Sequence, residues 1–142
     1  MKIKSILIGI FTFLFVAQSS MANADLVVVV NPHTTFNSLT RDELRRIFLG
    51  QTSNFPNGDH AIPFDVYGDY RNAFYQFILV RTPESVENYW ANMIFTGKAE
   101  PPRQVQLDEA KQLVATSFGG ISYIERSQVD SSVKVINIVI KK

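Results

Sequence analysis

The sequence has no cysteine among its 142 residues. Disulfide bonds and thiolate chemistry are therefore excluded, and so is a lipoprotein anchor, which needs a cysteine at the mature N-terminus. A dominant sign of charge is also lacking, since 14 Lys and Arg residues stand against 13 Asp and Glu. This balance excludes a global positive field of the kind that gathers nucleic acid or anionic lipid, so any anion site must be local.

Motifs for catalysis and metal binding are scarce as well. The sequence has 2 histidines, His33 and His60, and neither stands in a His-x-x-x-His or Glu-x-x-His spacing that would bind a metal. It contains neither a Gly-x-Ser-x-Gly nucleophile motif nor a Walker-type phosphate loop. We therefore expect no enzymatic activity, no metal and no cofactor.

The first 24 residues have the three parts of a secretory signal peptide. Lys2 and Lys4 form a basic region, Ile6 to Val16 is mostly apolar, and Ala22-Asn23-Ala24 is a small-residue cleavage site. The apolar run is too short to span a bilayer, which takes about 20 residues, although a retained membrane anchor is the alternative. We expect cleavage before Asp25, which leaves 118 residues (142 minus 24) in the periplasm. Loss of the two lysines changes the formal charge from +1 to −1.

Strands and helices alternate along the remaining chain. Leu26 to Val30 is a continuous apolar run, typical of a strand that is buried on both faces of a parallel sheet. Thr40-x-x-Glu43 is a capping box that opens a short helix, and Gly50 closes it. Further strands are expected at residues 61–67, 121–124 and 133–140, and a further helix at about residues 108–116.

Two more helices are expected in the middle of the chain. The first follows Gly68-Asp69, and the residues expected on its inner side are Tyr70, Phe74, Phe77 and Ile78. The second begins with Thr82 as N-cap and Pro83 at the first helical position. Its apolar residues follow the helical repeat and are Val86, Tyr89, Trp90, Met93 and Ile94. This spacing favours core packing of its Tyr and Trp over a sugar-stacking platform.

The alternation of strands and helices with short loops predicts the fold class. We expect one α/β domain over residues 25–142, with a mixed β-sheet flanked by helices. The chain shows no internal repeat and no linker long enough to separate two domains. Its length fits a single hydrophobic core.

Four segments of the chain stand in a characteristic order: VVVVNPHTTFNSLTRDELRRIFLG, FDVYGDYRNAFYQFIL, YWANMIFTGKAEPPRQV and VATSFGGISYI. Together they resemble the phosphate ABC transporter substrate-binding proteins, in particular the small stand-alone members of that family. The resemblance implies a type II periplasmic-binding-protein-like fold, of which this chain forms a single lobe. It also implies that phosphate or a related small oxyanion is the ligand and that an ABC permease is a partner.

The resemblance places the ligand at the turn after the second strand. Larger members have a Ser-Gly-Thr type turn there, whose hydroxyls and helix N-terminal amides hold phosphate. In this chain the turn is Gly68-Asp69-Tyr70 followed by Arg71, so the hydroxyl donors are missing. Asp69 either accepts a proton-bearing oxygen of hydrogen phosphate or serves only as an N-cap. The planar fork of Arg71 suits two oxygens of an anion, and an internal pair with Asp69 or Asp65 is the alternative.

Two other groups of residues are weaker candidates. Thr34 and Thr35 follow the first strand, at the carboxyl edge where α/β proteins usually bind ligands, and could donate hydroxyls. Turn formation would also explain a Thr pair. Gly119-Gly120 and Ser122 resemble a turn near the ligand cleft of the family, although positive φ would explain the glycines alone.

Two functions follow from the sequence. The first is a periplasmic solute-binding-like protein that binds phosphate or a related oxyanion and is linked to ABC-type uptake. The alternative is a ligand-free interaction module of an envelope complex. The missing hydroxyl donors favour this alternative, and so does the missing second lobe, because a two-lobed protein closes about a hinge to bury its ion.

Overall fold

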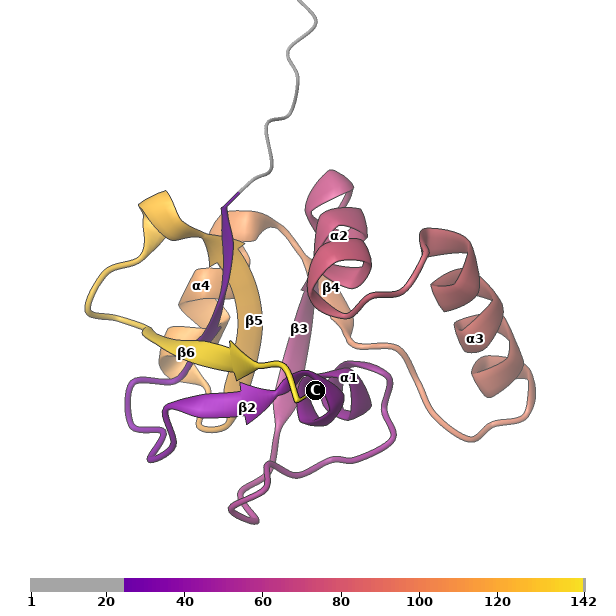
Figure 1. Ribbon diagram of the computed structural model, residues 1–142, viewed down its shortest axis with the longest axis horizontal. Helices are drawn as coiled ribbons and strands as arrows, with labels where there is room; N and C mark the ends of the chain where they lie inside the picture. Colours follow the sequence, from indigo (N-terminus) through magenta and orange to yellow (C-terminus); the bar gives the residue numbers. More distant parts are fainter. Residues whose placement is uncertain (1–24, 142) are drawn as a thin grey trace, which may run out of the picture.

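The computed structural model describes residues 25–141, so the signal peptide that we expect at residues 1–24 lies outside the described residues. Figure 1 shows a sheet with helices packed around it, and the strand order is β2-β6-β1-β5-β3-β4. The strands are β1 (Leu26–Val30), β2 (Ser38–Thr40), β3 (Ile62–Val66), β4 (Arg103–Val105), β5 (Gly120–Glu125) and β6 (Lys134–Val139). The predicted α/β class with a mixed sheet is confirmed.

The strand directions differ in part from those expected. The parallel pairs are β3 with β4, β3 with β5, and β2 with β6. The first strand, β1, is antiparallel to both of its neighbours, β5 and β6. Its predicted burial is confirmed, since Val27 to Val30 are all buried, but the parallel pairing expected from its apolar run is wrong. A continuous apolar run indicates that both faces of a strand are buried, and it does not indicate whether the strand is parallel or antiparallel to its neighbours.

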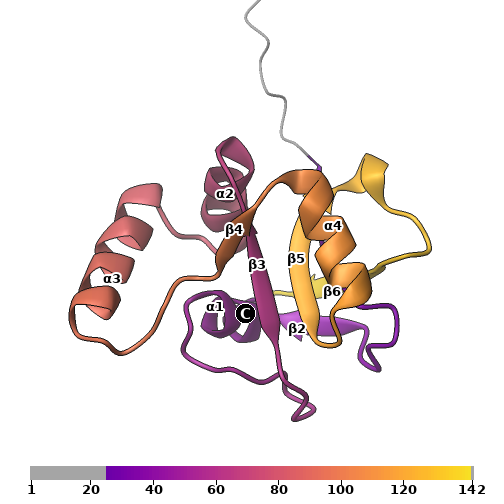
Figure 2. The same ribbon diagram turned by 180° about the vertical axis from the view of Figure 1, so that it is seen from behind.

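The helices cover both faces of the sheet. They are α1 (Arg41–Phe48), α2 (Asp69–Ala73), the π-helical segment η1 (Phe74–Ile78), α3 (Pro83–Phe95), α4 (Leu107–Thr116) and the 3-10 turn η2 (Arg126–Gln128). Figures 1 and 2 show α4 on one face and α1 and α2 on the other, while α3 stands to the side beyond the β4 edge. The arrangement leaves α3 attached to the rest of the protein through a few specific contacts.

The first helix begins as the sequence predicts. The Thr40 hydroxyl accepts a hydrogen bond from the backbone N–H of Glu43 at 3.2 Å, and the Glu43 carboxylate accepts one from the N–H of Thr40 at 2.7 Å. This reciprocal capping box satisfies two N–H groups that a helix terminus otherwise leaves open. Gly50 follows the helix with φ of 65°, as expected for the residue that ends it.

The helix after Gly68 differs from the expected regular helix. After one turn of α-helix it widens into η1, where the N–H of Leu79 donates to the carbonyl of Phe74 at 3.1 Å, five residues back. The wider turn rotates the following side chains relative to a 3.6-residue repeat. Tyr75 is therefore buried, and Phe77, which we expected on the inner side, is 61% exposed.

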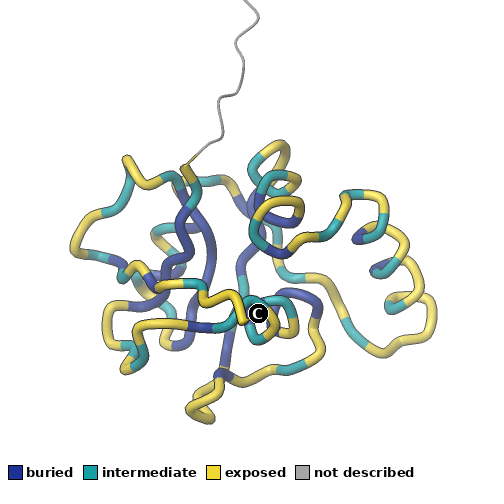
Figure 3. The backbone as a smooth tube through the Cα atoms, viewed as in Figure 1, coloured by how far each residue is buried: buried dark blue, intermediate teal, exposed yellow. Residues whose placement is uncertain are grey.

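The stripe of apolar residues on α3 is largely confirmed. Val86 and Trp90 are buried, and Tyr89 donates its hydroxyl to the carbonyl of Leu49 at 2.6 Å. Core packing of the aromatic pair is thus confirmed. Ile94, at the end of the stripe, is 58% exposed. Figure 3 shows buried, intermediate and exposed residues alternating along α3.

Candidate functional site

The predicted ligand turn lies where β3 passes into α2. Gly68 has φ of 75°, a conformation that glycine adopts without the steric cost of a side chain. Its carbonyl accepts hydrogen bonds from the N–H groups of Arg71 and Asn72, at 3.1 and 3.4 Å, which starts the helix. Asp69 is exposed, so the turn projects Asp69 outward and turns Arg71 back toward the sheet.

Arg71 lies between two carboxylates that differ in burial. Its Nε donates to Asp65 at 2.9 Å and its Nη1 donates to Glu87 at 2.9 Å. The Asp65 side chain is 1% exposed and the Glu87 side chain is 70% exposed. The guanidinium carbon also lies 5.0 Å from the centre of the Tyr75 ring, a cation–π distance. The sequence-based alternative of an internal pair with Asp65 is therefore present in the structure.

Asp65 is held by further donors inside the protein. Tyr75 donates its hydroxyl to Asp65 Oδ2 at 3.1 Å, and Tyr123 donates its hydroxyl to Oδ1. The Tyr123 oxygen in turn accepts the backbone N–H of Val66 at 3.0 Å. The two carboxylate oxygens thus receive bonds from two phenols and one guanidinium, which compensates a buried charge.

Burial controls the protonation of this cluster. Burial raises the pKa of Asp65 above its ordinary value, although Tyr123 and Arg71 act in the opposite direction. Burial and the neighbouring carboxylate also raise the pKa of Tyr75 and of Tyr123. For Arg71, burial lowers the pKa, but the charge of Asp65 and the hydrogen bonds outweigh it and keep the pKa above its usual range. Arg71 is therefore a permanent cation.

The predicted ligand residues fall into two groups, which lie at opposite ends of the strands. We use the word edge for each of these two sides of the sheet, where strands begin or end. The strand β5 is antiparallel to β1 and parallel to β3, so the carboxyl ends of β1 and β3 point in opposite directions. Gly68, Asp69 and Arg71 lie together after β3, whereas Thr34 and Thr35 lie after β1. The length of a strand, roughly 13 Å over four residue steps, separates the two edges. One small anion cannot contact both groups.

We call the second location the Asn31 edge, defined by Asn31, Thr34, Thr35 and Gly119, and the first the Arg71 edge, defined by Asp65, Gly68, Asp69 and Arg71. At the Asn31 edge the Nζ of Lys134 donates to the carbonyl of Thr34 at 2.9 Å. The Thr35 hydroxyl accepts from Asn57 at 3.3 Å. Both contacts serve the loop itself, in line with the turn-forming alternative for the Thr pair.

The glycine turn before β5 also has a structural role. Gly119 has φ of 86°, and a Cβ added there would lie 2.1 Å from the carbonyl oxygen of His60. Ser122 is buried and donates to the carbonyl of Phe64 at 2.7 Å. These residues join β3 to β5, and Ser122 does not reach an open surface.

Sequence reasoning missed Glu87, Tyr75 and Tyr123 as members of the Arg71 cluster. Glu87 and Arg71 are 16 positions apart and meet only because α3 returns beside α2. One local signal was available for Asp65, which stands as a charged residue between buried Phe64 and Val66 inside a strand. A charge in such a position needs a partner inside the protein.

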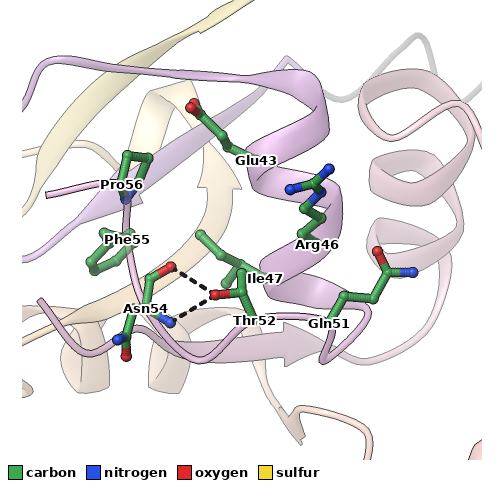
Figure 4. Close-up of a pocket in the computed structure, with 8 residues that line it drawn as sticks. All are labelled: Glu43, Arg46, Ile47, Gln51, Thr52, Asn54, Phe55 and Pro56. Carbon is green, nitrogen blue, oxygen red and sulfur yellow. Dashed lines mark hydrogen bonds between the residues drawn. The ribbon is translucent and has the colours of Figure 1, made fainter. Parts of the chain in front are cut away.

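A separate groove lies along α1 and is distinct from both edges. It has a volume of about 660 Å³ and runs between the helix and the segment 51–56, where the Thr52 hydroxyl bonds to the backbone of Asn54 (Figure 4). The lining residues are Glu43, Arg46, Ile47, Gln51, Thr52, Asn54, Phe55 and Pro56. None of the predicted ligand residues lines it. Of its charged lining residues, Glu43 is engaged in the cap of α1 through its carboxylate.

Two further properties concern metals and membranes. Within residues 25–141, no three His, Asp or Glu side chains are grouped so that they could hold a metal ion. None of the helices in this part of the chain is long and apolar enough to cross a membrane.

Comparison with solved structures identifies the fold. A Clostridium perfringens protein described as a phosphate ABC transporter substrate-binding protein, solved with bound phosphate, matches with a TM-score of 0.62 at 16% identity. An ABC-type phosphate transport receptor from Vibrio cholerae matches with a TM-score of 0.64 at 22% identity, and PstS from Borrelia burgdorferi with 0.59 at 13%. The chain has the fold of one part of these substrate-binding proteins. The resemblance read from the sequence is thereby confirmed for the fold.

The match to the substrate-binding proteins is partial in length. It covers 80% of this chain but only 44%, 46% and 47% of these three structures. The chain therefore spans less than half of each substrate-binding protein, in agreement with the single lobe that the sequence predicts. No protein-family model matches the sequence.

Proposed function

We propose that this chain is a periplasmic solute-binding-like protein that takes phosphate or a related small oxyanion at the Arg71 edge. The observation that carries the proposal is the contact between Arg71 and Glu87. A solvent-exposed carboxylate already sits 2.9 Å from the outer nitrogen of a guanidinium that is fixed from within. A carboxylate and a phosphate present oxygens of similar geometry to a guanidinium, so the same position suits an oxyanion.

The location of Arg71 supports this function. It follows the carboxyl end of β3, and open α/β sheets bind ligands at the carboxyl ends of their strands. Asp69 is exposed at the same turn and could accept the proton-bearing oxygen of hydrogen phosphate. The solved structures with this fold include one with bound phosphate, which favours the same class of ligand. Thr34 and Thr35 lie at the opposite edge and are not part of this proposed site.

The proposal extends to location and partner. Residues 1–24 would act as a signal peptide that delivers the protein to the periplasm, with cleavage before Asp25. An ABC-type permease would then be the partner that takes up the ion, since the similar structures are described as components of phosphate ABC transport.

Calorimetric titration of the purified protein with phosphate, in a phosphate-free buffer, tests the proposal. The variant is Arg71→Lys, which keeps the positive charge opposite buried Asp65 but loses the two-nitrogen fork. Arg71→Ala is less suitable than the sequence suggested, because it would leave a buried carboxylate without its cation. We expect saturable binding by the wild type and at least tenfold weaker binding by Arg71→Lys, with sulfate as the control ligand. No heat up to millimolar phosphate contradicts the proposal.

A second function rests on a different observation. Phe95 is 91% exposed at the end of α3 and its neighbour Ile94 is 58% exposed, and an apolar patch of this kind favours an interaction module for an envelope protein. Capture from envelope extracts with wild type, Phe95→Ser and Ile140→Ser tests it. A partner retained by wild type and Ile140→Ser and lost by Phe95→Ser supports this function. Equal capture by all three opposes it.

A further inference from the structure

The two carboxylates that bind Arg71 differ in how far they are exposed to solvent. On the inner side, Asp65 binds Nε and the ring of Tyr75 lies beneath the guanidinium, and both of these residues are 1% exposed. On the outer side, Glu87 reaches Nη1 from the second turn of α3 and is 70% exposed. The inner contacts fix the orientation of the guanidinium. The outer contact is made by a solvent-exposed carboxylate, while the Arg71 side chain itself is 11% exposed.

The outer contact is weak enough to exchange. A surface ion pair shifts an equilibrium by no more than about fivefold, since solvent screens it and two long side chains must be ordered. An inner pair is different, because separation would leave a buried charge without compensation. A solute anion that approaches Arg71 therefore displaces Glu87 and leaves Asp65 in place.

We infer that Glu87 is a built-in competitor for the anion position of Arg71, and that it lowers the affinity of the site until an oxyanion displaces it. The inference rests on the proposed function and adds the residue that sets its affinity. With Glu87 in place, Arg71 faces two carboxylates, so the three groups carry a formal charge of −1. When Glu87 leaves, Arg71 and Asp65 balance, and the incoming anion meets one carboxylate fewer. The ligand class is a small oxyanion with at least two oxygens within reach of one guanidinium edge.

Displacement of Glu87 has a structural consequence for α3. This helix stands apart from the sheet (Figures 1 and 2) and is tied to the body by Glu87, by the Tyr89 hydroxyl on Leu49, and by buried Val86 and Trp90. Release of the Glu87 contact removes the tie nearest to the ligand turn. Buried Val86 and the Tyr89 hydroxyl then hold α3 on the body.

The test compares phosphate titrations of wild type, Glu87→Gln and Glu84→Gln. Glu84 lies one turn earlier on α3, is exposed and does not contact Arg71, so its variant controls for the loss of one negative charge. We expect Glu87→Gln to bind phosphate about five- to tenfold more tightly than wild type, from lost competition and lost repulsion. Glu84→Gln should match wild type within about twofold. In Arg71→Lys/Glu87→Gln the gain should disappear relative to Arg71→Lys alone.

The outcomes separate this inference from the proposed function. If wild type and Glu87→Gln bind phosphate equally, the proposed function stands and the competitor role is overturned. If Glu84→Gln tightens binding as much as Glu87→Gln, the effect is general charge and the competitor role is again overturned. A silent wild type with a binding Glu87→Gln supports the competitor role of Glu87 and contradicts phosphate binding by the wild type at millimolar concentration. Silence of every variant up to tens of millimolar phosphate overturns both.

Discussion

At the Asn31 edge the buried Asn31 side chain binds backbone groups, whereas at the Arg71 edge the buried carboxylate of Asp65 binds other side chains. The Asn31 amide, which is buried, donates to the carbonyls of Val114, Ala115 and Ser117 at 3.1, 3.2 and 3.1 Å. The carbonyls of Val114 and Ala115 end α4 and would otherwise lack partners, whereas the Ser117 carbonyl also accepts the N–H of Gly120 at 2.9 Å. Such contacts are fixed by the course of the chain, because backbone acceptors do not move away without unfolding the helix end.

The Arg71 edge combines a fixed half and an exchangeable half. Asp65 is enclosed by β3, β5 and η1, while Glu87 reaches in from α3 and remains in solvent. A site that binds a solute needs a group whose present partner can leave at small cost. Of the two edges, only the Arg71 edge has such a group. The comparison therefore favours a stabilising role for the Asn31 edge and the ligand binding that we propose for the Arg71 edge.

Gly119→Ala should break the Asn31 edge with the largest effect. Its new Cβ would lie 2.1 Å from the His60 carbonyl oxygen, a backbone atom that cannot turn aside, and φ is 86°. Overpacking and an unfavourable φ together should cost about 4 kcal/mol of unfolding free energy or more. Gly58→Ala is the matched control, since φ is 93° there and nothing lies within 4 Å. Urea unfolding of both variants measures the difference, and equal losses would refute the close approach.

Asp65→Asn should break the fixed half of the Arg71 edge. The amide cannot accept from Arg71 as a carboxylate does, and it adds donors that face the Tyr75 and Tyr123 hydroxyls. Removal of one partner from a buried ion pair should lower the free energy of unfolding by about 3 kcal/mol. Asp42→Asn provides the comparison. The Asp42 side chain, which pairs with Arg45, is 76% exposed, so loss of this pair should lower the free energy of unfolding by about 1 kcal/mol or less. Similar losses for the two variants in urea unfolding would contradict a buried pair.

Asn31→Ala should weaken the cap of α4 without any change of charge. The variant leaves carbonyls at the end of α4 without a donor and also removes the Oδ1 that accepts the N–H of His33 at 3.0 Å. We expect a loss of about 2 kcal/mol. In Asn57→Ala, where the amide is exposed, thermal unfolding should change little. Faster hydrogen exchange confined to the last turn of α4 in Asn31→Ala would locate the effect, and uniform exchange would argue against a local cap.

The pH dependence of stability should report on the fixed half of the Arg71 edge. Because burial raises the pKa of Asp65 above its value of 3.8 in an unfolded chain, the folded state holds its proton when the unfolded state has lost it. The Asp65 contribution to stability is then fully present below pH 3.8 and declines as the pH rises through the folded pKa. Carbon NMR of the Asp65 carboxyl against pH measures this directly. A midpoint below 3.8 would reverse the sign and show that the three donors outweigh burial.

The parts of the fold that depend on local contacts could be predicted from the sequence. The capping box of Thr40 and Glu43, the Thr82-Pro83 start of α3 and the burial of β1 each involve residues close together in the chain, and each is confirmed. The three-residue strands β2 and β4 were not expected, because so short a segment carries no period of its own.

Contacts that depend on strand direction could not be predicted in the same way. Thr34 and Gly68 both follow a strand, and the sequence gives no reason to place them at different edges. Only the antiparallel pairing of β1 with β5 separates them. The pair of Arg71 and Glu87 likewise depends on the return of α3, a tertiary feature.

Val80→Gly should give the smallest effect, and it tests the one segment where helical periodicity failed. Val80 lies two residues after the end of η1 and has φ of 55°, an unfavourable conformation for a β-branched residue, while the N–H of Arg81 donates to the carbonyl of Tyr75 at 2.7 Å. The strained backbone at Val80 follows η1, which places the Tyr75 hydroxyl against Asp65 at the Arg71 edge. Glycine removes the strain, so the free energy of unfolding should rise by about 1 kcal/mol after the larger unfolded-state entropy of glycine is counted. In Val139→Gly, within a strand, the same change should lower stability, so a loss in both variants would show that Val80 carries no strain.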